Sequence, residues 1–123
     1  NVLDKAFERI SRFHRELFTI RFGKNVVNLL CRDIVYLESN KRKVIVHTVR
    51  GEYEYYHKLD EAEEELLAIS ADFVRIHKAY LVNMEHVEAF QYEKLALRDG
   101  TILSISEAHR ANVRSRFWEW GSE

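Results

Sequence analysis

The chain has 123 residues, of which 46% are hydrophobic and 32% are charged, and its formal net charge at pH 7 is −1. This length and composition indicate one globular domain, large enough for a real core but not for two domains. The near-neutral charge excludes a bulk polycation. Binding to nucleic acid would therefore require basic groups that gather on one part of the surface.

Membrane and secreted proteins are also excluded by the sequence. No apolar run approaches the length needed to cross a bilayer, and no signal-peptide pattern opens the chain. The single cysteine, Cys31, excludes an intrachain disulfide and suits a reducing compartment. We therefore expect a cytoplasmic protein with no membrane partner. Because the chain starts with Asn1 inside a predicted helix, we also expect it to be a piece of a longer protein.

The first predicted element is an amphipathic helix over residues 2–15. Charged residues separate apolar ones that recur at helical spacing, namely Leu3, Ala6, Phe7, Ile10 and Phe13. We expect residues 1–15 to form a linker helix and residues 16–123 to form the domain itself.

From Leu17 onward, apolar and polar residues alternate with the period of a β-strand. The pattern predicts strands over residues 17–22, 26–30, 35–39, 43–49 and 52–57. Polar segments at residues 23–25, 40–43 and 50–52 predict the turns between them. This first half of the domain therefore has the pattern of successive antiparallel strands.

A short acidic helix is predicted next, over residues 59–69. Its acidic residues occupy the first turns, where the helix dipole favours negative charge, and Leu66, Leu67 and Ile69 supply an apolar side. Further strands are predicted over residues 73–77, 86–92, 94–98 and 101–105. The dipeptide Asp99-Gly100 is a strong hairpin signal between the last two of these strands.

A last helix is predicted over residues 107–120. Ser106 can cap its first turn, and Val113, Phe117 and Trp120 form an apolar stripe beside Arg110 and Arg114. The elements together predict a mainly β domain with a helix at each end and one short central helix.

The six histidines raise the question of a metal or catalytic site. They show no HxH, HExxH or Cys/His ligand spacing, and the chain has no nucleophile elbow or Gly-rich phosphate loop. The acidic run of the central helix is typical of a solvated face. We therefore expect no metal, no cofactor, no catalytic residues and no enzymatic activity.

The charged residues are segregated along the chain. Acidic residues crowd into 60–65, whereas basic residues cluster at 41–43, at Arg75 and Lys78, and at Arg110, Arg114 and Arg116. Each basic cluster alone is typical of a solvent-exposed turn or helix face. All three nevertheless lie at strand ends, turns or helix starts, where a β scaffold presents side chains to a partner.

Four segments in one order identify a family. They are DIVYLES (33–39), KVIVHTVRGEYEYYHKLDEAEEEL (43–66), FVRIHKAYLVNMEHVEAF (73–90) and LALRDGTILSIS (95–106). In this order the chain resembles the LytTR family of bacterial DNA-binding domains over roughly residues 16–118. The most specific piece is the pattern F-x-R-I-H-K-x-Y-L-V-N, which the D-G hairpin and Ser106 follow.

The resemblance implies an elongated antiparallel β-sheet or sandwich, in which loops rather than a recognition helix enter the DNA grooves. It implies sequence-specific binding of double-stranded DNA by the output module of a bacterial two-component response regulator. An N-terminal regulatory domain, a receiver in the usual arrangement, would be missing from the chain. A second copy of the domain would bind beside the first on tandem repeat sites.

Three loop regions carry over as DNA contacts. The first is Asn40 to Lys43, with Arg42 as the base reader and with Asn40, Lys41 and Lys43 as further contacts. The second is Lys78, which can donate to guanine in the major groove. The third is the start of the last helix, with Arg110 as its basic member, Glu107 and His109 beside it, and Arg114 at most near phosphate.

The other residues of the F-x-R-I-H-K-x-Y-L-V-N pattern are expected to have different roles. His77 and Asn83 are expected to brace the segment structurally, whereas Arg75 either contacts phosphate or pairs with an acid. Two positions depart from the family pattern, because Ala79 stands where Ser is frequent and Glu107 where a basic residue is common. A carboxylate at Glu107 repels phosphate but can accept from cytosine N4. The alternative function is therefore a protein-interaction module on the same scaffold with DNA binding lost.

Overall fold

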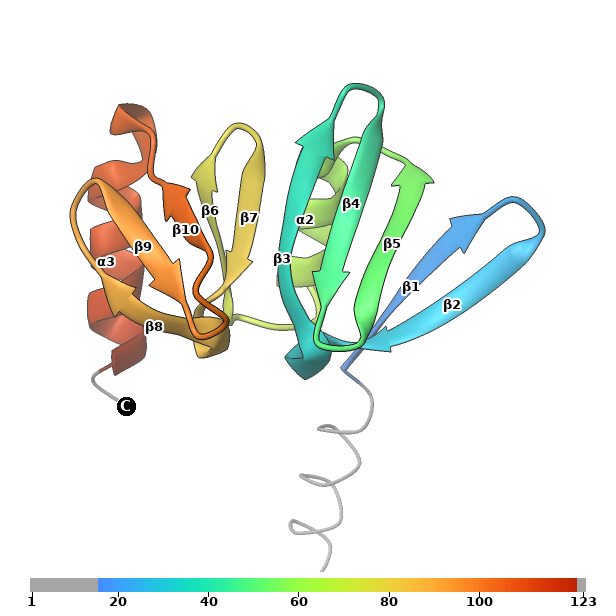
Figure 1. Ribbon diagram of the computed structural model, residues 1–123, viewed down its shortest axis with the longest axis horizontal. Helices are drawn as coiled ribbons and strands as arrows, with labels where there is room; N and C mark the ends of the chain where they lie inside the picture. Colours follow the sequence, from blue (N-terminus) through green and yellow to red (C-terminus); the bar gives the residue numbers. More distant parts are fainter. Residues whose placement is uncertain (1–15, 122–123) are drawn as a thin grey trace, which may run out of the picture.

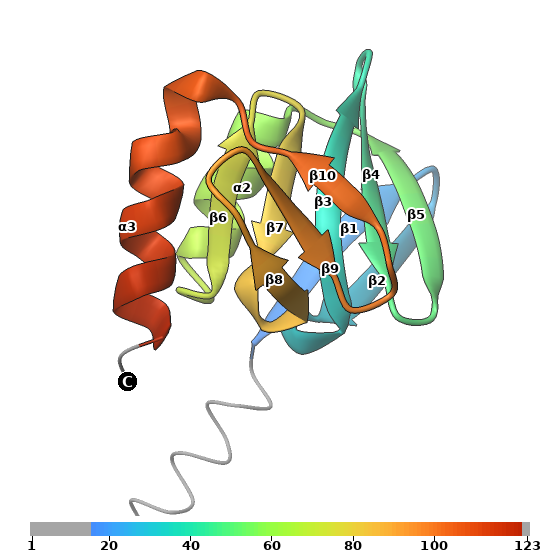
Figure 2. The same cartoon turned by 60° about the vertical axis from the view of Figure 1, so that its left-hand side comes forward.

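A computed structural model describes residues 16–121 (Figure 1). The helix expected over residues 2–15 lies outside the described residues. The described part is mainly β and consists of three antiparallel sheets with helices packed against them. Figure 1 shows the three sheets following one another along the long axis of the molecule, and Figure 2 turns the sheet of β8, β9 and β10 toward the viewer.

The first sheet is a two-stranded hairpin of β1 (Leu17–Phe22) and β2 (Asn25–Leu30). Phe18 and Ile20 alternate with exposed residues along β1 and are 2% and 1% exposed. This is the period-two pattern that predicted the strand. The connecting turn has a positive φ of 61° at Gly23, a conformation that glycine adopts at no steric cost.

The second sheet has five strands in the order β5-β4-β3-β7-β6, and all neighbouring pairs are antiparallel. Its strands are β3 (Ile34–Asn40), β4 (Lys43–Thr48), β5 (Gly51–Tyr56), β6 (Phe73–His77) and β7 (Tyr80–Asn83). Helix α2 (Leu59–Leu67) follows β5 and buries Leu59, Ala62 and Leu66 against this sheet. The motif RIHKAYLVN is thus the hairpin of β6 and β7, with Lys78 and Ala79 at its turn.

The third sheet has three strands in the order β10-β9-β8, with β8 (Val87–Phe90), β9 (Lys94–Leu97) and β10 (Ile102–Ser104). The predicted Asp99-Gly100 turn joins β9 to β10, with Gly100 at a φ of 95° and the Thr101 amide donating to Asp99 Oδ1 at 2.9 Å. Helix α3 (Arg110–Gly121) packs at the end of the molecule beyond this sheet, where Phe117 stacks on Phe90 with ring centroids 4.8 Å apart.

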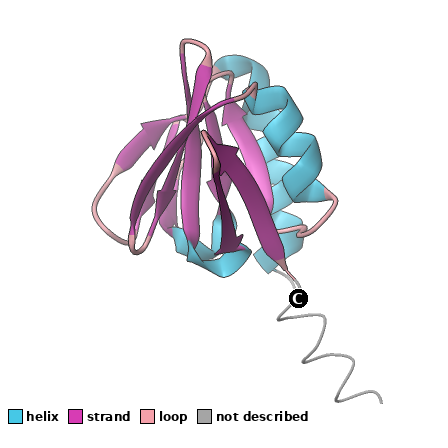
Figure 3. Cartoon of the chain, turned by 90° about the vertical axis from the view of Figure 1, so that its right-hand side faces the viewer, coloured by secondary structure: helices cyan, strands magenta, loops and turns pink. Residues whose placement is uncertain are grey.

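Two buried clusters divide the core between the two faces of β6 and β7. Phe73 and Leu81 join the cluster beneath α2 and the β1–β2 hairpin, whereas Val74, Ile76 and Val82 join the cluster beneath the third sheet and α3. Arg75 alternates with Val74 and Ile76, so it faces the α2 side of the sheet. Figure 3 shows the longer helices gathered along one side of the strands.

The start of the last helix differs from the expectation. Residues Glu107–His109 form a 3-10 turn, and the α-helix begins only at Arg110. Ser106 makes no side-chain cap, because its hydroxyl lies 2.6 Å from His109 Nδ1 instead of bonding a backbone amide. The apolar stripe is also shorter than expected. Val113 is buried, whereas Trp120 is 37% exposed and donates its indole N–H to Asp72 at 3.1 Å.

Candidate nucleic-acid interface

Three connections that are far apart in sequence lie at one edge of the molecule, the upper edge in Figure 1. The Ser39 amide at the end of β3 donates to Ala79 O in the β6–β7 turn at 2.8 Å. The Ser106 amide before α3 donates to Ile76 O at the end of β6 at 3.0 Å. These two backbone hydrogen bonds join all three loop regions that the sequence singled out.

The β3–β4 loop is a two-residue turn of Lys41 and Arg42, because Asn40 pairs with Lys43 in the sheet register. Lys41 has a φ of 61°, a left-handed conformation that is unfavourable for a residue with a Cβ. Both side chains are exposed and make no hydrogen bond or ion pair with any other residue that the structure describes. The turn therefore presents two unneutralised cations to solvent.

Lys43 differs from its neighbours in the same loop. Its Nζ lies 2.7 Å from Glu54 Oε1 and 4.9 Å from the centroid of the Tyr56 ring. The hydrogen bond and charge of Glu54 raise the pKa of Lys43. This ammonium is thus directed along the sheet toward β5, whereas Asn40 is exposed at the turn.

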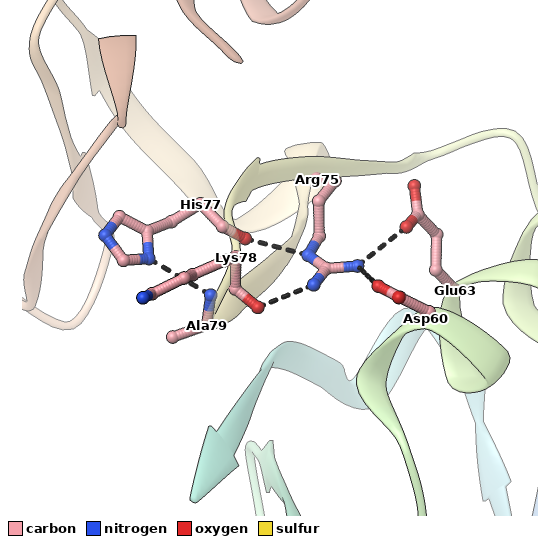
Figure 4. A network of polar contacts seen from close by, with 6 residues as sticks. All are labelled: Asp60, Glu63, Arg75, His77, Lys78 and Ala79. Carbon is pink, nitrogen blue, oxygen red and sulfur yellow. Dashed lines mark hydrogen bonds and ion pairs between the residues drawn. The ribbon is translucent and has the colours of Figure 1, made fainter. Parts of the chain in front are cut away.

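The β6–β7 loop is held by hydrogen bonds from Arg75 rather than by regular backbone hydrogen bonds between the two strands (Figure 4). The register of the two strands shifts between Arg75 and His77, which leaves carbonyls at the turn outside the ladder. Arg75 Nε donates to His77 O at 2.7 Å, and its Nη2 donates to Lys78 O. On the other side, its Nη1 donates to Asp60 and Glu63 of α2 at 2.8 and 2.9 Å. Of the two expectations for Arg75, the structure thus displays the pairing with acids.

The side chain of Lys78 is exposed at the tip of this loop and makes no hydrogen bond or ion pair within the described part of the chain. Figure 4 shows its side chain extending away from Arg75. The side chain of Lys78 can therefore reach a partner while Arg75 binds the backbone carbonyl of the same residue.

His77 binds a backbone amide of the same turn. Its Nδ1 accepts a hydrogen bond from the Ala79 amide at 3.0 Å, and its ring lies 5.3 Å from that of Tyr80. Burial lowers the pKa of His77, and the charges of Lys78, His109 and Arg75 lower it further. Both effects favour the neutral ring, the state in which Nδ1 can accept from Ala79.

Asn83 lies at the other end of β7 and is 1% exposed. Its Nδ2 donates to Ile34 O at 2.9 Å and to Cys31 O at 3.2 Å, and its Oδ1 accepts from the Glu85 amide at 3.0 Å. Asn83 therefore satisfies backbone groups of two neighbouring 3-10 turns, as a buried amide must.

The third region is joined to the end of β6 through the Ser106 amide, but its two arginines lie away from the other loops. Glu107 is exposed on the 3-10 turn, and His109 is bound to Ser106. Arg110 donates from Nε to Ile105 O at 3.2 Å and lies 5.7 Å from the centroid of the Tyr92 ring. Arg114 is exposed one turn further along α3, and it lines a separate hollow with Tyr92. These two arginines thus lie toward the β8–β9 connection.

The first two loops instead border one hollow of about 830 Å³. Lys41 and Arg42 line it from one side and Lys78 from another, and residues between β5 and α2 complete it. The His57 amide donates to Arg42 O at 3.2 Å and so connects this last segment to the β3–β4 loop.

Two residues of this hollow were missed by sequence reasoning. Lys58 is exposed immediately before α2, and Tyr56 is 75% exposed at the end of β5. Both lie in the family segment that continues through the acidic helix, and a lysine shortly before the acidic run that starts at Asp60 was the available signal. The carboxylates of Asp60 and Glu61 also line the hollow, so the part of the hollow near α2 carries both negative and positive charges.

Residues 16–121 contain no group of three or more His, Cys, Asp or Glu side chains that could hold a metal ion. None of their helices is long and apolar enough to span a bilayer. Cys31 is buried, and burial raises the pKa of its thiol to about 12, which keeps it protonated at neutral pH.

The chain is similar to known DNA-binding domains. The family model described as LytTr DNA-binding domain matches residues 24–118. The sensory transduction protein LytT of Bacillus subtilis (strain 168) is 23% identical over 112 residues, which cover 87% of this chain and 46% of that protein. The chain therefore spans about half the length of this relative.

A solved structure supports the fold assignment. A LytTr DNA-binding domain of a response regulator from Bacillus cereus superposes with a TM-score of 0.68 at 20% identity, covering 82% of this chain and 95% of that one. At this identity the likeness concerns the fold, which agrees with the mainly antiparallel β architecture expected from the sequence. The family match extends over most of the chain, and the chain belongs to the LytTR family of DNA-binding domains.

Proposed function

We propose that the chain binds double-stranded DNA in a sequence-specific manner through the edge that carries the β3–β4 and β6–β7 loops. The observation that supports this most strongly is the convergence of Lys41, Arg42, Lys58 and Lys78 around one hollow from three separate connections. Such segregation of exposed cations is what a chain of net charge −1 needs in order to attract phosphates.

The exposed polar residues of this edge divide into two roles. Arg42 and Lys78 contact base edges in the major groove, where an arginine or a lysine can donate to guanine O6 and N7. Lys41, Lys58 and Asn40 contact the phosphate backbone and fix the orientation of the domain on the duplex. Lys43 contributes less, because Glu54 already pairs with its ammonium.

The start of α3 makes the outer contacts. Arg110 binds Ile105 O through its Nε, which leaves the N–H groups of its Nη atoms for a phosphate or a base. Arg114 lies one turn further along α3, away from the edge. Glu107 and His109 border this contact, and Glu107 can either repel phosphate or accept from cytosine.

The domain serves as the output module of a bacterial transcription regulator, and it acts with a regulatory N-terminal domain. The family match and the greater length of the relative LytT, a sensory transduction protein, support this role. A receiver is the regulatory domain that the family resemblance implies.

Two copies bind tandem repeats on one face of the duplex, because a single domain of this size offers only a limited DNA surface. Insertion of about 5 bp between the repeats should abolish cooperative binding, whereas about 10 bp should partly restore it. Equal binding to all spacings, or saturation by one copy per site, would contradict this arrangement.

A protein-interaction module is the second candidate. The acidic residues Asp60 and Glu61 within the hollow and the exposed Glu107 favour it, since each repels phosphate. Such a module would bind duplex weakly and without sequence preference.

Selection from a random duplex library, followed by binding titrations at several salt concentrations, separates the two. DNA recognition predicts an enriched sequence whose affinity falls steeply with salt and exceeds that of a scrambled duplex. Failure to enrich any sequence, with equally weak binding to all duplexes, would favour the protein-interaction module.

A further inference from the structure

We propose that Arg75 sets the DNA sequence preference of the domain without touching DNA, by holding the β6–β7 loop in one conformation from α2. This inference rests on the proposed function, since it concerns how Lys78 is presented to the duplex. Arg75 is therefore a positioning residue rather than a phosphate contact.

The bonds of Arg75 leave little of its guanidinium for a phosphate. Its Nε and Nη2 donate to the carbonyls of His77 and Lys78, and its Nη1 donates to both Asp60 and Glu63. The side chain is only 11% exposed. Four of the roughly five N–H donors of an arginine are thus used inside the protein.

The two carbonyls that Arg75 binds flank the residue Lys78, since His77 O belongs to the peptide before it and Lys78 O to the peptide after it. The amide that leaves Lys78, that of Ala79, donates in turn to His77 Nδ1 at 3.0 Å. The backbone of Lys78 is therefore held on its carbonyl side by Arg75 and on its outgoing amide by His77, while the side chain extends outward (Figure 4). A loop fixed before binding loses less conformational entropy in the complex and discriminates more sharply between bases.

Helix α2 fixes the position of the Arg75 guanidinium in this arrangement. Asp60 and Glu63 lie on its first turns and direct the planar guanidinium toward the turn carbonyls. A lysine at position 75 would keep the charge but could not bind two carbonyls and two carboxylates at once, because the N–H donors of its ammonium all lie on one nitrogen and are fewer than these four acceptors.

The test compares Arg75→Lys, Arg75→Gln and the double variant Asp60→Asn/Glu63→Gln with the wild type. Each is titrated with the selected duplex and with a scrambled duplex at several salt concentrations. A positioning role predicts that the specific-to-nonspecific affinity ratio falls by about tenfold in the arginine variants. Their salt slope should stay that of the wild type.

The acid variant makes the test sharper, because it removes negative charge beside the DNA. Electrostatics alone would strengthen binding to both duplexes equally and leave their ratio unchanged. Positioning predicts a lower ratio despite the gain in positive charge. If Arg75 contacts phosphate instead, Arg75→Gln would weaken both duplexes equally and make the salt slope shallower by about one. That outcome would overturn the proposal.

A DNA-free measurement separates this inference from the proposed function. Amide hydrogen exchange at Ala79 should accelerate in Arg75→Lys and in the acid variant, while ladder amides of β3 and β4 exchange as in the wild type. Unchanged exchange at Ala79 would refute the positioning role whatever the DNA result. If the wild type shows no sequence preference, the proposed function fails, and the exchange data still decide whether Arg75 holds the loop. Thermal unfolding confirms that each variant is folded.

Discussion

The β3–β4 and β6–β7 loops lie side by side and present cations to the same hollow, yet they are held in different ways. The β3–β4 loop is shaped by backbone hydrogen bonds, those of the strand register and the one from the His57 amide to Arg42 O, and it places Lys41 in a strained conformation. Among the described residues no side chain braces it. The β6–β7 loop is shaped by side chains, since Arg75 and His77 bind its backbone from both sides.

This difference predicts which substitutions should change DNA binding. In the β3–β4 loop, effects on DNA binding should come from the residues that touch the duplex. In the β6–β7 loop, they should also come from residues that never touch it, such as Arg75. The following experiments test this contrast, from the largest expected effect to the smallest.

Lys78→Ala should produce the largest loss of specific DNA binding, about 1–3 kcal/mol, with a relaxed preference at one base pair. The braced loop presents this side chain already in place, so its full contact energy appears in the affinity. The free energy of unfolding should not change, because Lys78 is exposed. Binding titrations and denaturant unfolding measure the two quantities, and Lys24→Ala in the β1–β2 turn is the matched control. A Lys78→Ala protein that binds like the wild type would remove this residue from the interface.

Arg42→Ala should weaken specific binding relative to nonspecific binding by a smaller amount, about 1 kcal/mol. The unbraced side chain becomes ordered only on binding, which offsets part of its contact energy. Arg50 is the matched control, because it occupies the two-residue turn at the opposite end of β4. Titrations of both alanine variants with selected and scrambled duplexes should separate them. Equal effects of the two substitutions would mean that the β3–β4 edge has no special role.

Lys41→Gly should stabilise the fold while it weakens DNA binding. Glycine relieves the positive φ and raises the free energy of unfolding by about 0.5–1 kcal/mol. Loss of the cation should weaken all duplexes equally and make the salt slope shallower by about one. Lys24→Gly is the control, because Lys24 has no positive φ and glycine should destabilise there. A Lys41→Gly protein that is less stable than the wild type would contradict the strain at this turn.

The smallest effect concerns pH and the His77 brace. The pKa of His77 is lowered from 6.5 by burial and by neighbouring cations, so the unfolded chain binds the proton more readily than the folded one. Stability from His77 is therefore fully present above about pH 6.5 and is lost as the pH falls through the lower pKa of the folded state. The stability difference between the wild type and His77→Gln, from denaturant unfolding, should shrink on acidification. A difference that grows as the pH falls would show that the protonated ring stabilises the fold.

Most strands could be predicted from the sequence because their residues alternate with a period of two. Strand β7 (Tyr80–Asn83) was not predicted, because its last three residues are all buried and show no such alternation. The Asp99-Gly100 turn and the acidic helix α2 were also confirmed, since their local chemistry suffices to specify them. The start of the last helix could not be predicted in detail. Whether Ser106 caps the backbone or binds His109 depends on side-chain geometry three residues away.

The candidate interface was only partly predictable for the same physical reason. The family pattern brought out Arg42 and Lys78, but whether Arg75 pairs with acids or phosphate depends on where α2 packs against β6. That packing brings Asp60 and Glu63, distant in sequence, within 2.8 and 2.9 Å of Arg75. Lys58 was missed because its place in the hollow follows from the backbone contact between His57 and Arg42.

The central claim is that DNA binds at the edge formed by the β3–β4 and β6–β7 loops. Titration of the isotopically labelled chain with its selected duplex, followed by backbone amide chemical shifts, tests this most directly. The account predicts the largest shifts at Lys41, Arg42, Lys58 and Lys78, with none at Arg50 on the opposite edge. Shifts concentrated at Arg50, or along α3 near Trp118 and away from both loops, would contradict it.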